Sequence, residues 1–320
     1  MVRIMKSNSV VFSLIVAFVS VVGLEVVEWR SKVNEVDTSQ VQGVSRVEET
    51  LDSQQNSEVL TLPEEFFDPT TYFSSVKAHQ AKTGGEQSRR IVAGVVPHHL
   101  VASDMIADFF SSLSEQKVTT LILIGPNHYE TGSNLVISGT QAVRTQFGDT
   151  YPDTDLITRL QELSFVSVEN NVVQADHAIG SHIPFLQHYL PQTRIVPLLI
   201  SARMNKDDIE QLAFALARQL HNEEIVLLAS VDFSHYLPLR VSEEKDRETL
   251  TLMEQHNYNR LLSLGDDHAD SPASIVTLLR TMEILGNTGF EVRDHSNSAI
   301  ILGEDVPSTT SYFELIFADN

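Results

Sequence analysis

The chain has no cysteine among its 320 residues. This absence excludes thiolate metal sites, cysteine nucleophiles and disulfide bonds. Basic residues are also scarce, with 22 Lys and Arg against 43 Asp and Glu, which gives a net charge of −21 at pH 7. A surface this acidic repels the phosphate backbone of nucleic acids, so we expect no nucleic-acid partner.

Two sequence motifs of common enzymes are missing. The chain contains neither a glycine-rich phosphate loop nor a Gly-x-Ser-x-Gly nucleophile elbow. Nucleotide binding and α/β-hydrolase chemistry are therefore disfavoured. Ser234 precedes His235, but neighbours on an extended segment point to opposite faces, so the two make a poor pair of nucleophile and base.

One apolar run, Val10–Leu24, follows a basic N-terminus. Its length and flank are typical of a signal anchor or a signal peptide. No clear cleavage site follows, so we predict a transmembrane signal anchor over residues 1–28, with the rest exported and held at the membrane. The alternatives are a cleaved signal peptide of a secreted protein and a buried helix of a soluble one. Residues 29–59 are polar and aperiodic and are predicted to be a linker, which leaves residues 60–320 as the folded domain.

Strand-like and helix-like segments alternate through this domain. Runs typical of buried strands are Ile91–Val96, Thr119–Ile124, Arg194–Ile200, Glu224–Val231 and, at an edge or antiparallel, Thr309–Phe317. Segments with helical spacing of apolar residues are Leu100–Leu113, Asp155–Leu163, Asp207–His221, 243–264 and 273–285. This alternation predicts a single α/β domain, doubly wound, with a mostly parallel central sheet and helices on both faces.

Histidines follow three of the predicted buried strands. They stand in Pro97-His98-His99, in Gly125-Pro126-Asn127-His128 and in Asp232-Phe233-Ser234-His235, and a further group contains Asp176, His177 and His182. The carboxyl ends of parallel strands meet at one edge of a sheet, where the ligand crevice lies. We therefore expect these groups to form one site in that crevice.

Imidazoles beside a carboxylate are typical ligands of divalent iron, copper or zinc, and two His with one carboxylate form the facial triad of non-haem iron enzymes. The carboxylates available within these motifs are Asp232 and Asp176. The pattern predicts a metal site, with iron or copper favoured and zinc an alternative. The competing interpretation is structural, with each His bonded to loop backbone.

As a set, the motifs resemble the Memo family, the B proteins of the AmmeMemoRadiSam system. They are PHH at 97–99, GPNH at 125–128, FGD at 147–149, ADHAIGSHIPFLQ at 175–187, SVDFSHY at 230–236, and DHSNSA and TTSYF near the C-terminus. They follow the family's order over residues 90–317. The fold of this family is similar to that of the catalytic subunit of class III extradiol ring-cleavage dioxygenases. The resemblance thus implies a doubly wound domain with an iron or copper site at the strand ends.

The resemblance also implies roles for individual residues. His98 matches the first His of the family's PH motif and His128 the His of its GP[SN]H motif, so both would be metal ligands. The third family position, in a DF[CST]H motif, is Ser234, which is a poor ligand. Asp232, on the same face of an extended chain, is the substitute candidate, and His182 or His177 are others. In the dioxygenases a further pocket His is the acid or base, a catalytic role that His182 or His177 would fill here.

Two functions follow from this interpretation. One is a metal-dependent oxidoreductase that resembles the extradiol dioxygenases and acts on a small molecule in the crevice. The other is a metal-binding or peptide-binding module without turnover, tethered to the membrane. A zinc hydrolase belongs with the first, since His and Asp ligands also suit zinc.

Overall fold

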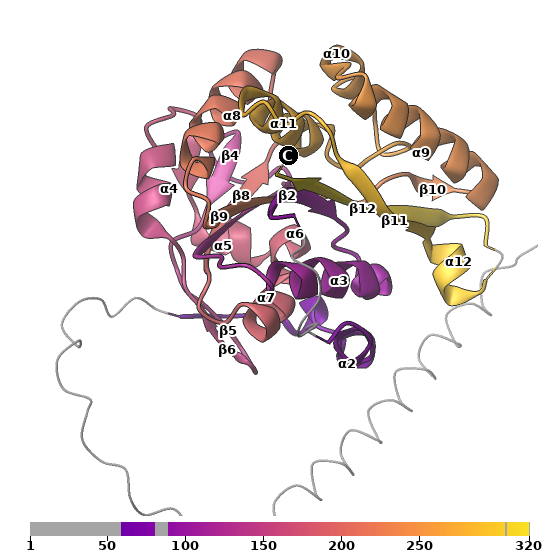
Figure 1. Ribbon diagram of the computed structural model, residues 1–320, viewed down its shortest axis with the longest axis horizontal. Helices are drawn as coiled ribbons and strands as arrows, with labels where there is room; N and C mark the ends of the chain where they lie inside the picture. Colours follow the sequence, from indigo (N-terminus) through magenta and orange to yellow (C-terminus); the bar gives the residue numbers. More distant parts are fainter. Residues whose placement is uncertain (1–58, 81–88, 305, 320) are drawn as a thin grey trace, which may run out of the picture. The chain divides into compact units, whose positions relative to one another are not determined.

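The computed structural model describes residues 59–80, 89–304 and 306–319 (Figure 1). Within these residues the main feature is a nine-stranded sheet in the order β10-β12-β2-β9-β3-β8-β4-β7, with β11 beside β12. The strands are β2 (Ile91–Val96), β3 (Thr120–Pro126), β4 (Val136–Ser138), β7 (Val166–Val168), β8 (Arg194–Ile200), β9 (Ile225–Ser230), β10 (His235–Leu237), β11 (Glu291–Asn297) and β12 (Thr309–Ala318).

The sheet is parallel at its centre, and an antiparallel pair lies on either side of this centre. β2, β9, β3 and β8 run parallel to one another, as do β4 and β7. β4 is antiparallel to β8, and β12 is antiparallel to β2, β10 and β11. The prediction of a mostly parallel sheet is therefore correct for the central strands and for the β4–β7 pair, but not for β12 or for the β4–β8 pair. The connections explain the β4–β8 pair: a chain that continues in a parallel direction needs a long crossover, whereas no helix lies between β3 and β4. β4 therefore runs opposite to β3 and to β8, which is parallel to β3.

Helices cover both faces, as the doubly wound prediction requires. Side chains of β3 alternate between two cores, with Ile122 and Ile124 in one and Leu121 and Leu123 in the other. The first core is closed by α4 (Thr154–Leu160), α8 (Lys206–Leu220), α9 (Leu239–Glu254), α10 (Tyr258–Leu261) and α11 (Pro272–Ile284). The second is closed by α2 (Pro69–Ala78), α3 (Ser103–Leu113), α5 (Asn170–Gln174), α6 (His177–Gly180) and α7 (Ile183–Tyr189). Figure 1 shows these two layers on either side of the sheet.

Shorter elements complete the described chain. A small sheet joins β1 (Leu60–Thr61), β5 (Val143–Thr145) and β6 (Gly148–Thr150), and the remaining helices are η1 (Glu64–Phe66), η2 (Leu100–Ala102) and α12 (Ser298–Leu302). None of the described helices is long and apolar enough to cross a membrane. The predicted anchor (1–28) and nearly all of the predicted linker (29–59) lie outside the described residues, so both stay predictions.

The register of the central strands brings their ends together. Val96, the last residue of β2, pairs with Ser230, the last residue of β9, and Ile124 of β3 pairs with Ala229 of β9. The segments that follow these three strands therefore emerge side by side. Gly125 lets α6 approach this edge, because a Cβ there would lie 2.9 Å from the Cβ of Ala178.

Gly94, in the middle of β2, also allows neighbouring residues to approach the backbone closely, and this position provides a test of the packing. A Cβ at this position would lie 2.3 Å from Cε2 of Phe109 and 2.9 Å from the carbonyl oxygen of Leu315. We predict that Gly94→Ala lowers the free energy of unfolding by about 1–3 kcal/mol, the usual cost of overpacking a core, measured by urea denaturation. Gly289→Ala is the control, since nothing lies within 4 Å of its Cβ position. Equal stabilities of the two variants would contradict this packing.

Candidate metal centre

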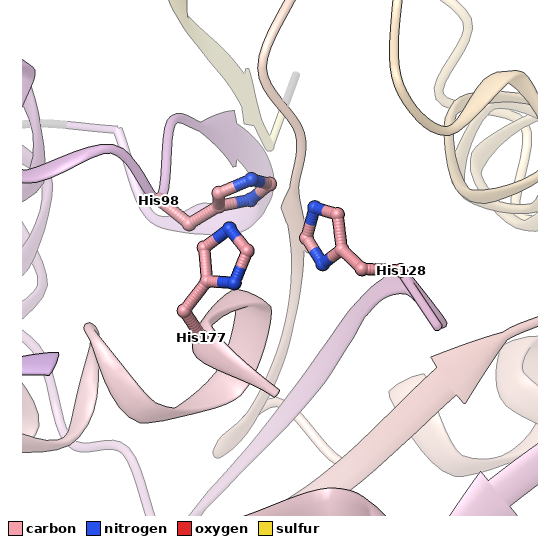
Figure 2. Close-up of side chains that lie close together, drawn as sticks. All are labelled: His98, His128 and His177. Atoms are coloured by element: carbon pink, nitrogen blue, oxygen red, sulfur yellow. The ribbon is translucent and has the colours of Figure 1, made fainter. Parts of the chain in front are cut away.

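Three imidazole rings meet at the carboxyl edge of the central strands. His98 follows β2, His128 follows β3 and His177 begins α6. Ring centroids are 5.0 Å apart for His98 and His128 and 4.9 Å apart for His98 and His177. Figure 2 shows the three rings turned toward one another, and ligand atoms of all three lie within 4.8 Å of each other. The structure thus brings together the histidine groups from Pro97-His98, GPNH and the ADHAIGSH stretch.

His98 is fixed by hydrogen bonds on its inner side. Its backbone N–H donates to Oδ1 of Asp232 (3.1 Å), and its Nδ1 lies 3.0 Å from Oγ of Ser230. The opposite nitrogen, Nε2, lies 3.1 Å from Oδ2 of Asp270 and 3.7 Å from Oδ2 of Asp232. With 3 % of its surface exposed, the ring has little freedom to turn, so Nε2 is the nitrogen presented to the site.

His128 is oriented in the same way by Asp176. The carboxylate accepts the backbone N–H of His128 at 3.0 Å, and its other oxygen lies 2.8 Å from Nδ1 of that ring. The same carboxylate caps α6 by accepting the N–H of Ala178 at 3.0 Å. Asp176 therefore fixes His128 and the start of α6 at once, and Nε2 of His128 is left to face Asp270 at 3.8 Å.

Asp270, which the sequence analysis missed, is the carboxylate shared by the two histidines. It lies in the loop before α11, and two hydrogen bonds hold this loop against the segment that follows β9. Asp270 N–H donates to the carbonyl of Asp232 (3.1 Å), and Asp232 N–H donates to Oδ2 of Asp270 (3.3 Å). Oδ1 of Asp270 is buried and has no hydrogen-bond partner among the described residues. The only sequence signal was a helix start, Asp270-Ser271-Pro272, which many structural loops share.

The charges of the site follow from this arrangement. Burial lowers the pKa of His128, but hydrogen bonds and charge from Asp176 and Asp270 outweigh it and raise the pKa to about 9. Burial and the neighbouring His98 and His128 lower the pKa of His177 to about 4. Burial opposes ionisation of Asp270, yet the flanking His98 and His128 keep its pKa below the usual range. At neutral pH Asp270 is thus charged and His177 is neutral.

His177 differs from the other two rings in its geometry. Its ring is stacked on that of His128, with centroids 4.1 Å apart and an angle of 19° between the planes. The rings of His98 and His128 are nearly perpendicular, at 88°. An imidazole nitrogen binds a metal in the plane of its ring, so His98 and His128 are able to share one ion, whereas the stacked pair is poorly placed to do so.

The other predicted site residues lie outside the cluster of imidazoles. His182 is fully buried, and its Nε2 lies 2.9 Å from Oγ of Ser230, behind His98. Ser234 is also fully buried; its Oγ lies 2.6 Å from Oγ of Ser242 and 2.9 Å from Oγ of Ser311. The expectation that Asp232 and Ser234 share a face is wrong, because the chain bends at Ser234. Asp232 faces His98, and together with Asp270 these residues form a second group of ligand atoms within 4.8 Å.

The rings and carboxylates lie on the wall of a crevice of about 580 Å³. Its lining includes His98, His128, His177, Asp232 and Asp270, but neither His182 nor Ser234. Among the described residues no Lys or Arg lines it, and Glu130 and Asp266 add negative charge. The volume is in the range of small-molecule sites.

The hydrogen bond between Asp176 and His128 predicts that the unfolding free energy of the metal-free protein depends on pH. A His pKa raised from 6.5 to about 9 stabilises the fold fully below pH 6.5, and this contribution is lost as the pH rises through about 9. We expect Asp176→Asn to lower the pKa of His128 in an NMR titration and to weaken the fall in unfolding free energy between these pH values. Asp266→Asn, at an exposed carboxylate of the crevice, is the control. An unchanged His128 pKa in Asp176→Asn would contradict the assignment.

Comparison with known proteins agrees with the fold and with the motifs. The family model described as Memo-like protein matches residues 70–316. The MEMO1 family protein of Sulfolobus acidocaldarius is 29 % identical over 235 residues, which are 70 % of this chain and 82 % of the relative. The protein of Caldivirga maquilingensis is 23 % identical over 72 % of this chain and 85 % of the relative. That of Pyrobaculum arsenaticum is 30 % identical over 53 % and 61 %, respectively.

Among solved structures, the uncharacterized protein JW3007 from Escherichia coli K12 has a similar fold. The superposition has a TM-score of 0.51 at 16 % identity and covers 70 % of this chain and 99 % of the other. At this identity the likeness concerns the fold alone. The family match, in contrast, spans most of the chain and contains all three histidine motifs that follow strands. The chain belongs to the Memo-like protein family.

Proposed function

We propose that this protein holds one divalent metal ion, iron or copper, with His98, His128 and Asp270 as ligands, and acts as an oxidoreductase on a small molecule bound in the crevice. The observation that carries the proposal is the pairing of the two imidazoles. Each has its Nδ1 beside a buried partner, Ser230 or Asp176, and each presents Nε2 to the same carboxylate. Outer hydrogen bonds that orient metal-binding histidines in this way are typical of metal sites.

The donor set fits a metal ion of this kind. Metal binding would displace the proton of His128, and two neutral imidazoles and a carboxylate then form a facial triad, which leaves positions open for substrate or oxygen. The unpartnered Oδ1 of Asp270 supports this assignment, since buried polar atoms are nearly always bonded. Two groups of potential ligand atoms, His98/His128/His177 and His98/Asp232/Asp270, share His98. The Nδ1 atom of His98 is hydrogen-bonded to Ser230, so only Nε2 is free to bind a metal. We therefore expect one ion and not two. Zinc would suit the same ligands and is the alternative metal.

A bound iron or copper ion would supply redox chemistry and polarise a ligand oxygen at this place. The chain supplies the rest. His177 is a neutral ring at the crevice wall, stacked on His128, and so it is able to accept a proton from a bound ligand. Because no Lys or Arg lines the crevice among the described residues, an anionic group on the ligand would have only the metal to pair with.

A peptide-binding module without turnover is the second candidate, favoured by the rim of the crevice. Tyr236 lines the crevice with 72 % of its surface exposed, at a left-handed φ of 61°. Such strain in a residue other than glycine is concentrated at functional sites. Large exposed aromatic side chains are common anchors in protein interfaces. A peptide side chain in the crevice, with Tyr236 against the peptide, would use the same metal without chemistry.

For the location of the domain we retain the sequence-based proposal. The apolar run Val10–Leu24 after a basic N-terminus supports a signal anchor with the domain exported. A reporter enzyme that is active only outside the cytoplasm, fused to the C-terminus, tests this. Reporter activity that is lost on deletion of residues 1–28 is expected, and its persistence would contradict the anchor.

The ligand set predicts metal content. In purified full-length protein we expect about one ion per chain by elemental analysis, lost in His98→Ala, His128→Ala and Asp270→Asn because each removes one of three donors. Ser234→Ala is the matched control and should retain the ion, since Ser234 faces Ser242 and Ser311. Loss of metal from the control with retention in Asp270→Asn would refute the ligand set, and a wild type that stays metal-free after supplementation would refute the metal centre.

The role of His177 separates enzyme from binding module. If it moves protons, His177→Ala should lower the rate of oxygen consumption with a catechol-type substrate by about 10²–10⁴-fold, the usual range for general acid or base catalysis, while metal content stays unchanged. An oxygen electrode measures the rate, and elemental analysis provides the control. No oxygen consumption by the metal-loaded wild type would favour the binding module.

A further inference from the structure

Ser230 lies between two buried imidazoles. Its Oγ is 3.0 Å from Nδ1 of His98 and 2.9 Å from Nε2 of His182. Ser230 is the last residue of β9, and His182 immediately precedes α7. Both are 0 % exposed, and neither lines the crevice. The three side chains therefore form a hydrogen-bonded row that leads from His98 at the crevice wall to His182 beside Phe110 of the second core.

The direction of the hydrogen bonds along this row depends on which nitrogen of His98 carries the proton. A neutral imidazole has one N–H, and a hydroxyl has one proton to donate. If His98 binds a metal through Nε2, its proton is on Nδ1, and Nδ1–H donates to Oγ of Ser230. The hydroxyl proton of Ser230 is then free to be donated to Nε2 of His182. His182 carries its own proton at Nδ1, the atom that has no hydrogen-bond partner among the described residues.

We propose that His182 is a positioning residue: it accepts the hydroxyl proton of Ser230 and thereby keeps His98 in the tautomer with a bare Nε2 toward the crevice. The inference rests on the proposed metal centre, because it assigns the tautomer that a metal ligand needs. The tautomer of a ligating histidine is set by the bond of its other nitrogen.

The surroundings of His182 support an acceptor role. The ring is sealed from water, so no solvent molecule is at hand to replace it as the partner of Ser230. Phe110 lies next to it, with ring centroids 6.2 Å apart, and burial among such neighbours disfavours a charged ring. A charged His182 would carry N–H groups on both nitrogens and have no lone pair to accept the hydroxyl proton of Ser230, so neutrality is a condition of the relay.

The test compares three variants of the full-length protein with Zn²⁺ as the probe metal. His182→Leu and Ser230→Ala each break the relay, whereas His182→Gln keeps a side-chain oxygen near the position of Nε2. We expect His182→Leu and Ser230→Ala to weaken Zn²⁺ affinity by about 10–100-fold, the usual effect of removing a hydrogen bond to a metal-binding histidine. His182→Gln should retain most of the wild-type affinity. The double variant should be no weaker than either single one, since both remove the same relay.

Urea denaturation of each variant separates positioning from stability. If His182 only fills space, His182→Leu changes the unfolding free energy but not Zn²⁺ affinity, and the proposal is overturned. A second readout is ¹⁵N NMR of the His182 ring in the metal-free and Zn²⁺-loaded wild type, with the proton expected on Nδ1. A proton on Nε2 in a protein that binds Zn²⁺ would overturn the relay alone. A wild type that binds no Zn²⁺ and, after supplementation, neither iron nor copper would instead overturn the metal centre on which the relay rests.

Discussion

The site depends on the way two histidines are held at their Nδ1 atoms. His98 is held by Ser230 and His128 by Asp176, and both partners are buried. These bonds turn the two Nε2 atoms toward Asp270 and set the ring planes nearly at right angles. The parallel centre of the sheet makes this arrangement possible, because the C-terminal ends of β2, β9 and β3 lie side by side. The segments that follow these strands therefore begin at the same edge of the sheet.

The same bonds offset the cost of burying charge. A carboxylate taken out of water is costly unless hydrogen bonds and opposite charge compensate it. Asp176 is 1 % exposed, and it accepts two backbone N–H groups besides its contact with His128. Asp270 is compensated less completely, since one of its oxygens has no partner among the described residues. A buried carboxylate oxygen without a partner lowers the stability of the fold, and a bound cation would remove this cost. This is the physical argument for a cation beside Asp270.

Much of the fold, but only part of the site, could be predicted from the sequence. The strands Ile91–Val96 and Arg194–Ile200 were predicted with their observed bounds, because buried parallel strands are continuous apolar runs. The antiparallel edges were not, since pairing direction depends on connections that a local pattern does not contain. His98 and His128 were found because they follow strands. Asp270 was missed because hydrogen bonds to Asp232, far away in the sequence, bring it to the site.

The most direct test of the account is a crystal structure of the metal-loaded protein, with anomalous diffraction recorded at the absorption edge of the bound metal. The account predicts one anomalous peak in the crevice, within bonding distance of Nε2 of His98, Nε2 of His128 and the carboxylate of Asp270, with His177 stacked beside His128 and not bonded to the metal. A peak bonded to His177 in place of Asp270, or a peak at Ser234, would contradict the central claim.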